Sequence, residues 1–136
     1  MSLLTVSVLV NQSIEKVWDS FTQAQQVQHW NFASPDWHCP SAKNQFIEGG
    51  EFHYLMAAKD ASFEFDFWGT FDTIIPQQSL HITLGDGRKM EVFFEKQGNQ
   101  TLLTENFEPE TMNTHELQVM GWQSILNQFK KYVEGE

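Results

Sequence analysis

The sequence predicts an α+β fold in which a curved antiparallel sheet is closed by one long C-terminal helix. Between residues 51 and 107, apolar and polar side chains alternate with a period of two, which is typical of half-buried strands. Residues from about 112 to 133 carry apolar side chains at helical spacing. The order is strand, two short helices, a run of strands and one long helix, so helices and strands are segregated along the chain.

The N-terminal part predicts one strand followed by two short helices. Residues 3–10 alternate apolar and polar side chains and are expected to form the strand. Ser13 suits the N-cap of the helix that follows, because its hydroxyl can accept a hydrogen bond from a free backbone amide. A second helix is expected over residues 24–30, with Val27 and Trp30 as its buried pair.

Residues 31–44 show no clean periodicity, and they contain Pro35 and Pro40. We interpret this segment as an ordered loop. Its aromatic side chains indicate that it packs against the rest of the molecule. Trp37 and Cys39 are expected to hold the loop on the mouth of a cavity.

Five further strands are predicted, over residues 51–58, 63–75, 80–84, 89–95 and 101–107. Gly69 indicates a bend or bulge within the second of them. Gly98 and Asn99 form a tight hairpin signal between the last two. One face of each strand is apolar, and the side chains expected to point inward include Phe63, Phe65, Phe67, Phe71, Leu80, Ile82, Leu84, Met90, Val92 and Phe94.

The predicted C-terminal helix begins with residues suited to an N-cap and carries a continuous apolar stripe. Asn113 and Glu116, three residues apart, resemble a capping box. At about 100° per residue, one broad stripe collects Trp122, Ile125, Leu126, Phe129, Tyr132 and Val133. This stripe is expected to cover the apolar face of the sheet.

Composition limits the classes of partner. The 136 residues include 18 acidic and 8 basic side chains, a net charge of −10, which disfavours nucleic acid and anionic membranes. The single cysteine, Cys39, cannot form an internal disulfide. No signal peptide or membrane-spanning run is recognisable, so we expect one cytoplasmic domain over residues 1–136.

Several segments together resemble a known superfamily. They are residues 13–18 (SIEKVW), Trp30, residues 31–40 (NFASPDWHCP), 121–126 (GWQSIL) and 129–134 (FKKYVE). The chain resembles the helix-grip superfamily of START-like domains, also called SRPBCC. Within it, the chain looks like the branch named after the C-terminal domain of the activator of the heat-shock-protein-90 ATPase. The resemblance implies a seven-stranded curved sheet gripping the C-terminal helix, with a cavity between them. Relatives bind sterols, lipids, polyketides or a chaperone.

Two polar residues interrupt the predicted apolar faces. Glu105 shares a strand face with Leu103 and Phe107, and Gln118 falls at the centre of the helix stripe. The two could meet as polar anchors in an aromatic cavity. The alternative is that Glu105 is solvated at a strand edge and Gln118 lies at the open helix end. The candidate ligand-binding residues are Trp37, Phe52, Tyr54, Phe65, Phe67, Met90, Val92, Glu105, Gln118, Trp122, Ile125 and Phe129.

Neither a metal nor a cofactor is expected. Asp36, His38 and Cys39 are potential zinc ligands, but neighbours in an extended segment point apart and no second cluster accompanies them. No nucleophile elbow or phosphate-binding loop is recognisable.

Three functions remain after these exclusions. The favoured hypothesis is binding of a hydrophobic or amphipathic small molecule, which would enter between residues 31–44 and the start of the last helix. A second is a cyclase- or hydrolase-like enzyme with Glu105 as general acid or base. A third is a chaperone-linked interaction module, which predicts a wide exposed apolar patch and no open cavity. Whether two chains pair as a homodimer stays open.

Overall fold

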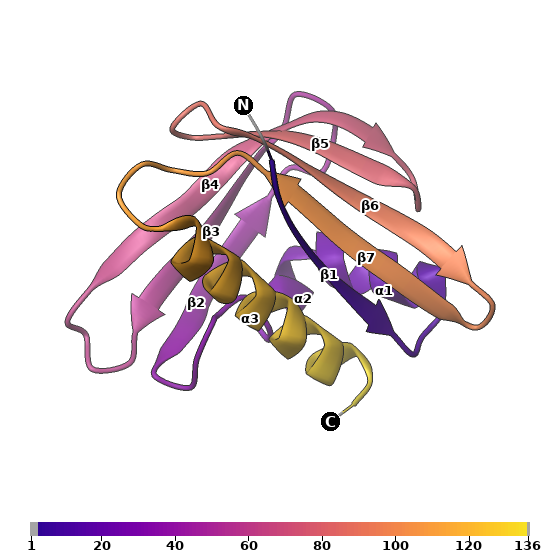
Figure 1. Ribbon diagram of the computed structural model, residues 1–136, viewed down its shortest axis with the longest axis horizontal. Helices are drawn as coiled ribbons and strands as arrows, with labels where there is room; N and C mark the ends of the chain where they lie inside the picture. The colour runs from indigo at the N-terminus through magenta and orange to yellow at the C-terminus, as the bar shows by residue number, and fades with distance from the viewer. Residues whose placement is uncertain (1–2, 136) are drawn as a thin grey trace.

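The computed structural model describes residues 3–135, and within them the elements follow the predicted order (Figure 1). This order confirms the predicted α+β class. The elements are β1 (Leu4–Val10), α1 (Ile14–Thr22), α2 (Ala24–Val27), β2 (Trp37–Asn44), β3 (Glu51–Ala58), β4 (Glu64–Ile75), β5 (Ser79–Leu84), β6 (Lys89–Gln97), β7 (Gln100–Phe107) and α3 (His115–Val133).

The strands form one seven-stranded antiparallel sheet in the order β1-β7-β6-β5-β4-β3-β2. Strands β2 to β7 pair as successive neighbours, whereas β1 joins at the far side and pairs with β7. The sheet curves around α3 (Figure 1), which is the arrangement expected of the helix-grip fold. The predicted hairpin at Gly98 and Asn99 is confirmed, and Gly98 takes the positive φ of 63° that the turn requires.

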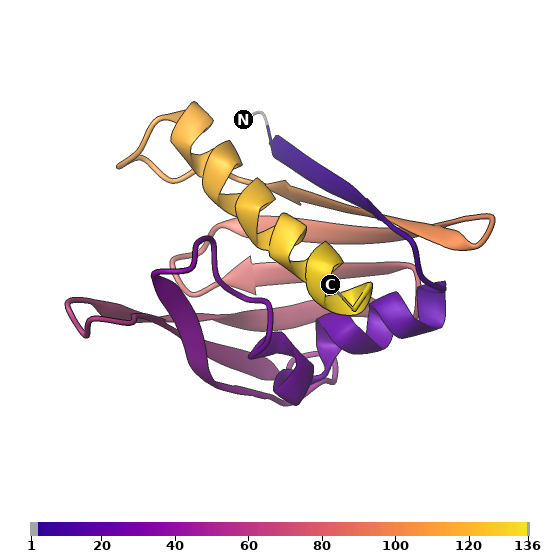
Figure 2. The same cartoon turned by 90° about the horizontal axis from the view of Figure 1, so that it is seen from below.

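Helix α3 packs along β1, and the C-terminal end of α3 lies near α1 (Figure 2). The second half of α3 anchors the helix in the core, since Leu126, Phe129 and Val133 are buried. The Phe129 ring lies edge-on to Phe21 and Trp30, with centroids 5.7 Å and 4.9 Å away. These contacts join the two ends of the chain around one aromatic core.

The prediction of a loop over residues 31–44 was wrong for its second half. Residues 37–44 form β2, an edge strand paired with β3. Proline cannot donate to a ladder, but Pro40 falls where the β2–β3 register shifts between His38 and Ser41. The bulge therefore accommodates the proline that made this segment look irregular in the sequence.

The helix starts are partly as predicted. Ser13 caps α1 as expected, because its Oγ accepts a hydrogen bond from the Lys16 amide at 3.3 Å. The predicted capping box of α3 was wrong by one residue: Thr114 is the N-cap, and its Oγ1 accepts from the Leu117 amide at 3.2 Å. Asn113 lies outside the helix, where its backbone and side-chain amides donate to the Glu110 carboxylate.

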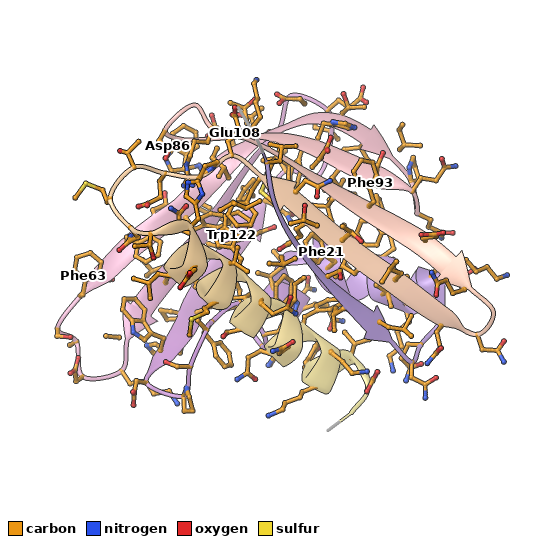
Figure 3. The ribbon with its side chains drawn as sticks, viewed as in Figure 1. Phe21, Phe63, Asp86, Phe93, Glu108 and Trp122 are labelled. Carbon is orange, nitrogen blue, oxygen red and sulfur yellow. The ribbon has the colours of Figure 1, made fainter. Side chains whose placement is uncertain are left out.

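The first half of β4 differs from the prediction. Phe63 and Phe65 were expected to be buried, but 59% and 43% of their surfaces are exposed. Figure 3 shows Phe63 near the β3–β4 turn, away from α3. Gly69 is not at a bulge, because the register shift of β4 lies between Phe71 and Thr73. A Cβ at Gly69 would instead come within 2.9 Å of the Phe52 ring, so glycine is needed for close packing.

Candidate functional site

A cavity of about 260 Å³ lies between the concave face of the sheet and α3. Strands β3 to β7 form most of its wall, α3 forms its roof, and residues from α1 and the segment after α2 close one end. Its lining is mostly aromatic and aliphatic: Phe21, Thr22, Trp30, Asn31, Phe52, Tyr54, Met56, Phe65, Phe67, Phe71, Leu80, Ile82, Arg88, Met90, Glu105, Trp122 and Ile125.

The aromatic walls are held by ring-to-ring packing. The indole of Trp122 stacks flat on the Phe107 ring, with centroids 3.8 Å apart and an interplanar angle of 7°. Phe67 meets the same indole edge-on at 6.2 Å. Across the cavity, Phe52 packs against Tyr54 at 4.8 Å and against Phe67 at 5.7 Å. These contacts fix the positions of the rings, so the space between them is preformed.

Some of the lining side chains on β4 and α3 are exposed or partly exposed. Phe65 lines the cavity and is 43% exposed, and the cavity-lining Trp122 and Ile125 of α3 are only partly buried. Figure 3 shows Trp122 on the N-terminal half of α3, over the sheet.

Glu105 points into this cavity from β7. Alternation along the strand buries Thr101, Leu103 and Phe107 completely and leaves Glu105 only 7% exposed. The inward alternative from the sequence is thus the observed one. Within residues 3–135 no hydrogen bond or ion pair engages the Glu105 carboxyl group. Burial raises the pKa of Glu105 to about 8, so the group is mostly uncharged at neutral pH.

Three other polar side chains in the wall already have partners. Tyr54 Oη accepts a hydrogen bond from Asn44 Nδ2 at 3.1 Å, and burial raises the pKa of Tyr54 to about 12. Asn31 Nδ2 donates to the sulfur of Met56 at 3.2 Å. The Thr22 hydroxyl donates to the backbone carbonyl one helical turn earlier, at 2.8 Å. Glu105 is therefore the ionisable group in this wall that has no hydrogen bond or ion pair in the described chain.

Arg88 also borders the cavity, but its guanidinium is engaged. Its Nε donates to Asp86 Oδ2 at 2.8 Å, and its Nη1 donates to the backbone carbonyl of Glu108 at 3.2 Å. Figure 3 shows Asp86 and Glu108 at the same end of the sheet. The positive charge is therefore held at that end by an acidic neighbour.

Eight of the twelve candidate residues line the cavity: Phe52, Tyr54, Phe65, Phe67, Met90, Glu105, Trp122 and Ile125. Gln118 does not, although it is buried. Its Nε2 donates to the carbonyls of Glu110 and Asn113 at 3.1 Å and 2.9 Å, and its Oε1 accepts from the Glu110 amide at 2.9 Å. The predicted meeting of Gln118 with Glu105 was wrong, because Gln118 ties down the segment that precedes α3.

The three remaining candidates lie elsewhere. Val92 and Phe129 are fully buried core residues. The Trp37 ring packs against Phe63 and Phe65 with centroids 6.1 Å away in each case, beside the cavity rather than in its wall. Trp37 therefore supports Phe65, which does line the cavity.

Sequence reasoning missed nine lining residues as members of the site: Phe21, Thr22, Trp30, Asn31, Met56, Phe71, Leu80, Ile82 and Arg88. Alternation along the strands predicted that Phe71, Leu80 and Ile82 point inward, although not that they line a cavity. No sequence signal separates an inward side chain that fills the core from one that borders a void.

Asp36, His38 and Cys39 form no metal site; across residues 3–135, no group of three His, Cys, Asp or Glu side chains is arranged to hold a metal ion. The Cys39 thiol is buried, and this burial raises its pKa to about 11. Of the helices described, none is long and apolar enough to span a bilayer.

Comparison with known proteins gave one family and a set of structures. The family model described as "Activator of Hsp90 ATPase homolog 1-like protein" matches residues 11–134. The solution structure of an AHSA1-like protein from Aeromonas hydrophila shares 38% identity with a TM-score of 0.88, over 97% of this chain and 93% of that one. A Cytophaga hutchinsonii protein shares 44% identity with a TM-score of 0.84, over 98% and 92%.

More distant structures share the fold alone. CalU16 from Micromonospora echinospora is 17% identical with a TM-score of 0.72, over 96% of this chain and 75% of that one. A search of curated proteins found no match to this chain.

Proposed function

This chain belongs to the family of activator of Hsp90 ATPase homolog 1-like proteins, and on that premise we propose that it binds a hydrophobic or amphipathic small molecule between the sheet and α3. The observation that carries the proposal is the cavity of about 260 Å³ with a predominantly apolar lining. Small-molecule sites are typically preformed apolar cavities with a few placed polar groups. An apolar cavity of about 150 Å³ is enough to hold benzene. A ring with a short chain therefore suits this space.

Titration with phenylbutanol tests the proposal, because its ring matches the aromatic walls and its chain is uncharged. Calorimetry and amide chemical shifts should both report saturable binding, with the shifts centred on the cavity walls. Ile125→Phe places a larger side chain in the cavity roof and should weaken binding at least tenfold. Met120→Phe is the matched control, since Met120 lies on the same helix with 64% of its surface exposed.

The two variants must differ for the proposal to stand. Equal binding by both, or the absence of saturable binding by the parent protein, refutes the cavity as the site. Native mass spectrometry of the freshly purified protein then identifies the mass of any natural occupant.

A chaperone partner is a second candidate, favoured by the family's description and by apolar residues exposed at the start of α3. Met112, Leu117 and Met120 are 87%, 57% and 64% exposed. Under this candidate, purified Hsp90 should bind the protein, and Leu117→Asp should abolish that binding without affecting phenylbutanol. The open cavity favours the small-molecule proposal, because an interaction module needs no such space.

A cyclase- or hydrolase-like reaction is the third candidate and would use Glu105 as general acid or base. Its support is the position of Glu105 in the cavity wall, where burial raises the pKa of the carboxyl to about 8, a value that suits proton transfer near neutral pH. Carbon-detected NMR titration of the Glu105 carboxyl measures this directly. A pKa near that of a free glutamate would remove the reason for the candidate.

A further inference from the structure

Glu105 has no structural role that explains its place in the cavity wall. It is 7% exposed, and no group in residues 3–135 forms a hydrogen bond or ion pair with its carboxyl. Its neighbours across the sheet are Val6 on β1 and Val92 on β6, both buried and apolar. Burying an unpaired carboxyl destabilises a fold, so a hydrophobic residue would serve folding better here. Among the described residues no fully buried side-chain oxygen lacks a partner, so the unbonded Glu105 oxygens reach the open space of the cavity, where a ligand can bond to them.

The surroundings favour a positively charged partner. A neutral polar ligand needs only a neutral donor, such as an amide or hydroxyl, and would not require a carboxyl group. A carboxyl adds the capacity for negative charge. The rings of Trp122, Phe67 and Phe52 border the same space, and aromatic faces attract cations. The net charge of −10 raises the local concentration of cations further.

The one cation in the wall does not compete for this role. Arg88 is bound to Asp86 and to the backbone carbonyl of Glu108, and no salt bridge joins Arg88 to Glu105 in the described chain. Glu105 is therefore available to an incoming cation.

We propose that the ligand of this cavity is an amphipathic amine, whose protonated amino group pairs with the Glu105 carboxylate while its apolar body packs against the aromatic walls. This inference rests on the proposed small-molecule function and adds the chemical class of the ligand. The amine donates to the Glu105 oxygens, and the pair replaces the hydrogen bonds that both groups lose on leaving water.

The proposal fixes the sign of a pH dependence. The ionisable residues lining the cavity are Glu105, Arg88 on the segment before β6 and Tyr54 on β3, while α3 presents Trp122 and Ile125. Burial raises the pKa of Tyr54 to about 12, and arginine stays charged, so Glu105 is the group that changes near neutral pH. Glu105 must release its proton to pair with the amine. Amine affinity should therefore rise about fiftyfold between about pH 6 and pH 8, most steeply below about pH 7.

Phenylbutylamine and phenylbutanol form the test pair, since they share one apolar body and differ in the charged group. Calorimetry is performed on the parent protein at about pH 6, 7 and 8, in about 0.5 M NaCl to screen non-specific attraction. The amine should bind more tightly as the pH rises, whereas the affinity for the alcohol should stay constant or fall. Glu105→Gln should remove the rise for the amine. Glu95→Gln, at an exposed position on β6, should change the binding of neither compound.

The outcomes separate the two proposals. If neither compound binds, the small-molecule function fails. If the alcohol binds but the amine binds no more tightly at pH 8 than at pH 6, the function stands and the amine inference is overturned. The parent's pH dependence needs no variant, so the test holds even if Glu105→Gln alters folding.

Discussion

Replacing Glu105 should change how the stability of this protein depends on pH. In the folded chain the carboxyl lies in an apolar cavity without a partner, and burial raises its pKa from 4.5 to about 8. In the unfolded chain the same group is in water. Glu105→Gln removes the titration and keeps the size of the side chain, so a comparison of the two proteins isolates the contribution of the ionisable proton.

The magnitude follows from the difference between the two pKa values. Because the folded pKa is raised, the folded protein holds the proton more tightly than the unfolded chain. The full stability is present below about pH 4.5 and is lost as the pH rises toward about 8. The loss is about 1.4 kcal/mol per pH unit over most of this range. Between about pH 5 and pH 7.5 the parent should therefore lose about 3 kcal/mol relative to Glu105→Gln.

Urea denaturation followed by tryptophan fluorescence measures this difference at a series of pH values. The control is Glu95→Gln, whose side chain is exposed on β6, and its stability should follow that of the parent. If the curves for the parent and for Glu105→Gln run parallel from about pH 5 to pH 7.5, the reasoning is refuted. A parallel course would mean that the carboxyl is solvated or paired in the folded protein.

Three further predictions concern packing, capping and reactivity. Gly69→Ala should destabilise by roughly 1–3 kcal/mol, since its Cβ would lie 2.7 Å from the Thr83 carbonyl. Gly121→Ala, with open space around it in α3, should stabilise by roughly 0.5–1 kcal/mol; urea denaturation checks both, and equal effects would contradict the packing argument. Thr114→Ala should cost about 1 kcal/mol through loss of the α3 cap, measured by thermal unfolding. The Cys39 thiol, whose pKa burial raises to about 11, should react with Ellman's reagent only as fast as the protein opens; rapid labelling of the native protein would contradict this.

The elements that the sequence predicted well are those whose pattern is long and regular. Period-two alternation placed β3 to β7 to within a few residues, and the helical stripe placed α3. Prediction failed where a tertiary contact overrides the local pattern. Pro40 hid β2 because proline normally interrupts a strand, and only pairing with β3 shows that a bulge accommodates it. Phe63 and Phe65 alternate like core residues, but both are exposed, and their rings pack against Trp37 of the edge strand β2.

The site was harder to predict than the fold, because a cavity depends on where neighbouring side chains leave space unfilled. Alternation left both orientations of Glu105 open, and it correctly turned Phe52 and Tyr54 of β3 inward. It could not show that Phe129 and Val92 meet neighbours on all sides while Ile125 and Met90 border a void. That distinction depends on the path of α3 over the curved sheet.

Glu105 and Gln118 show why burial of a polar residue does not by itself mark a functional site. Both were selected for the same reason, a polar side chain on an apolar face, and both prove to be buried. Gln118 lies next to the irregular segment before α3. Its side-chain amide donates to the backbone carbonyls of Glu110 and Asn113 and accepts from the Glu110 backbone amide. Glu105 lies in the middle of a regular strand, where the sheet ladder already uses the neighbouring backbone groups. A polar side chain at that position has no local backbone partner, so the Glu105 oxygens are left facing the open space of the cavity.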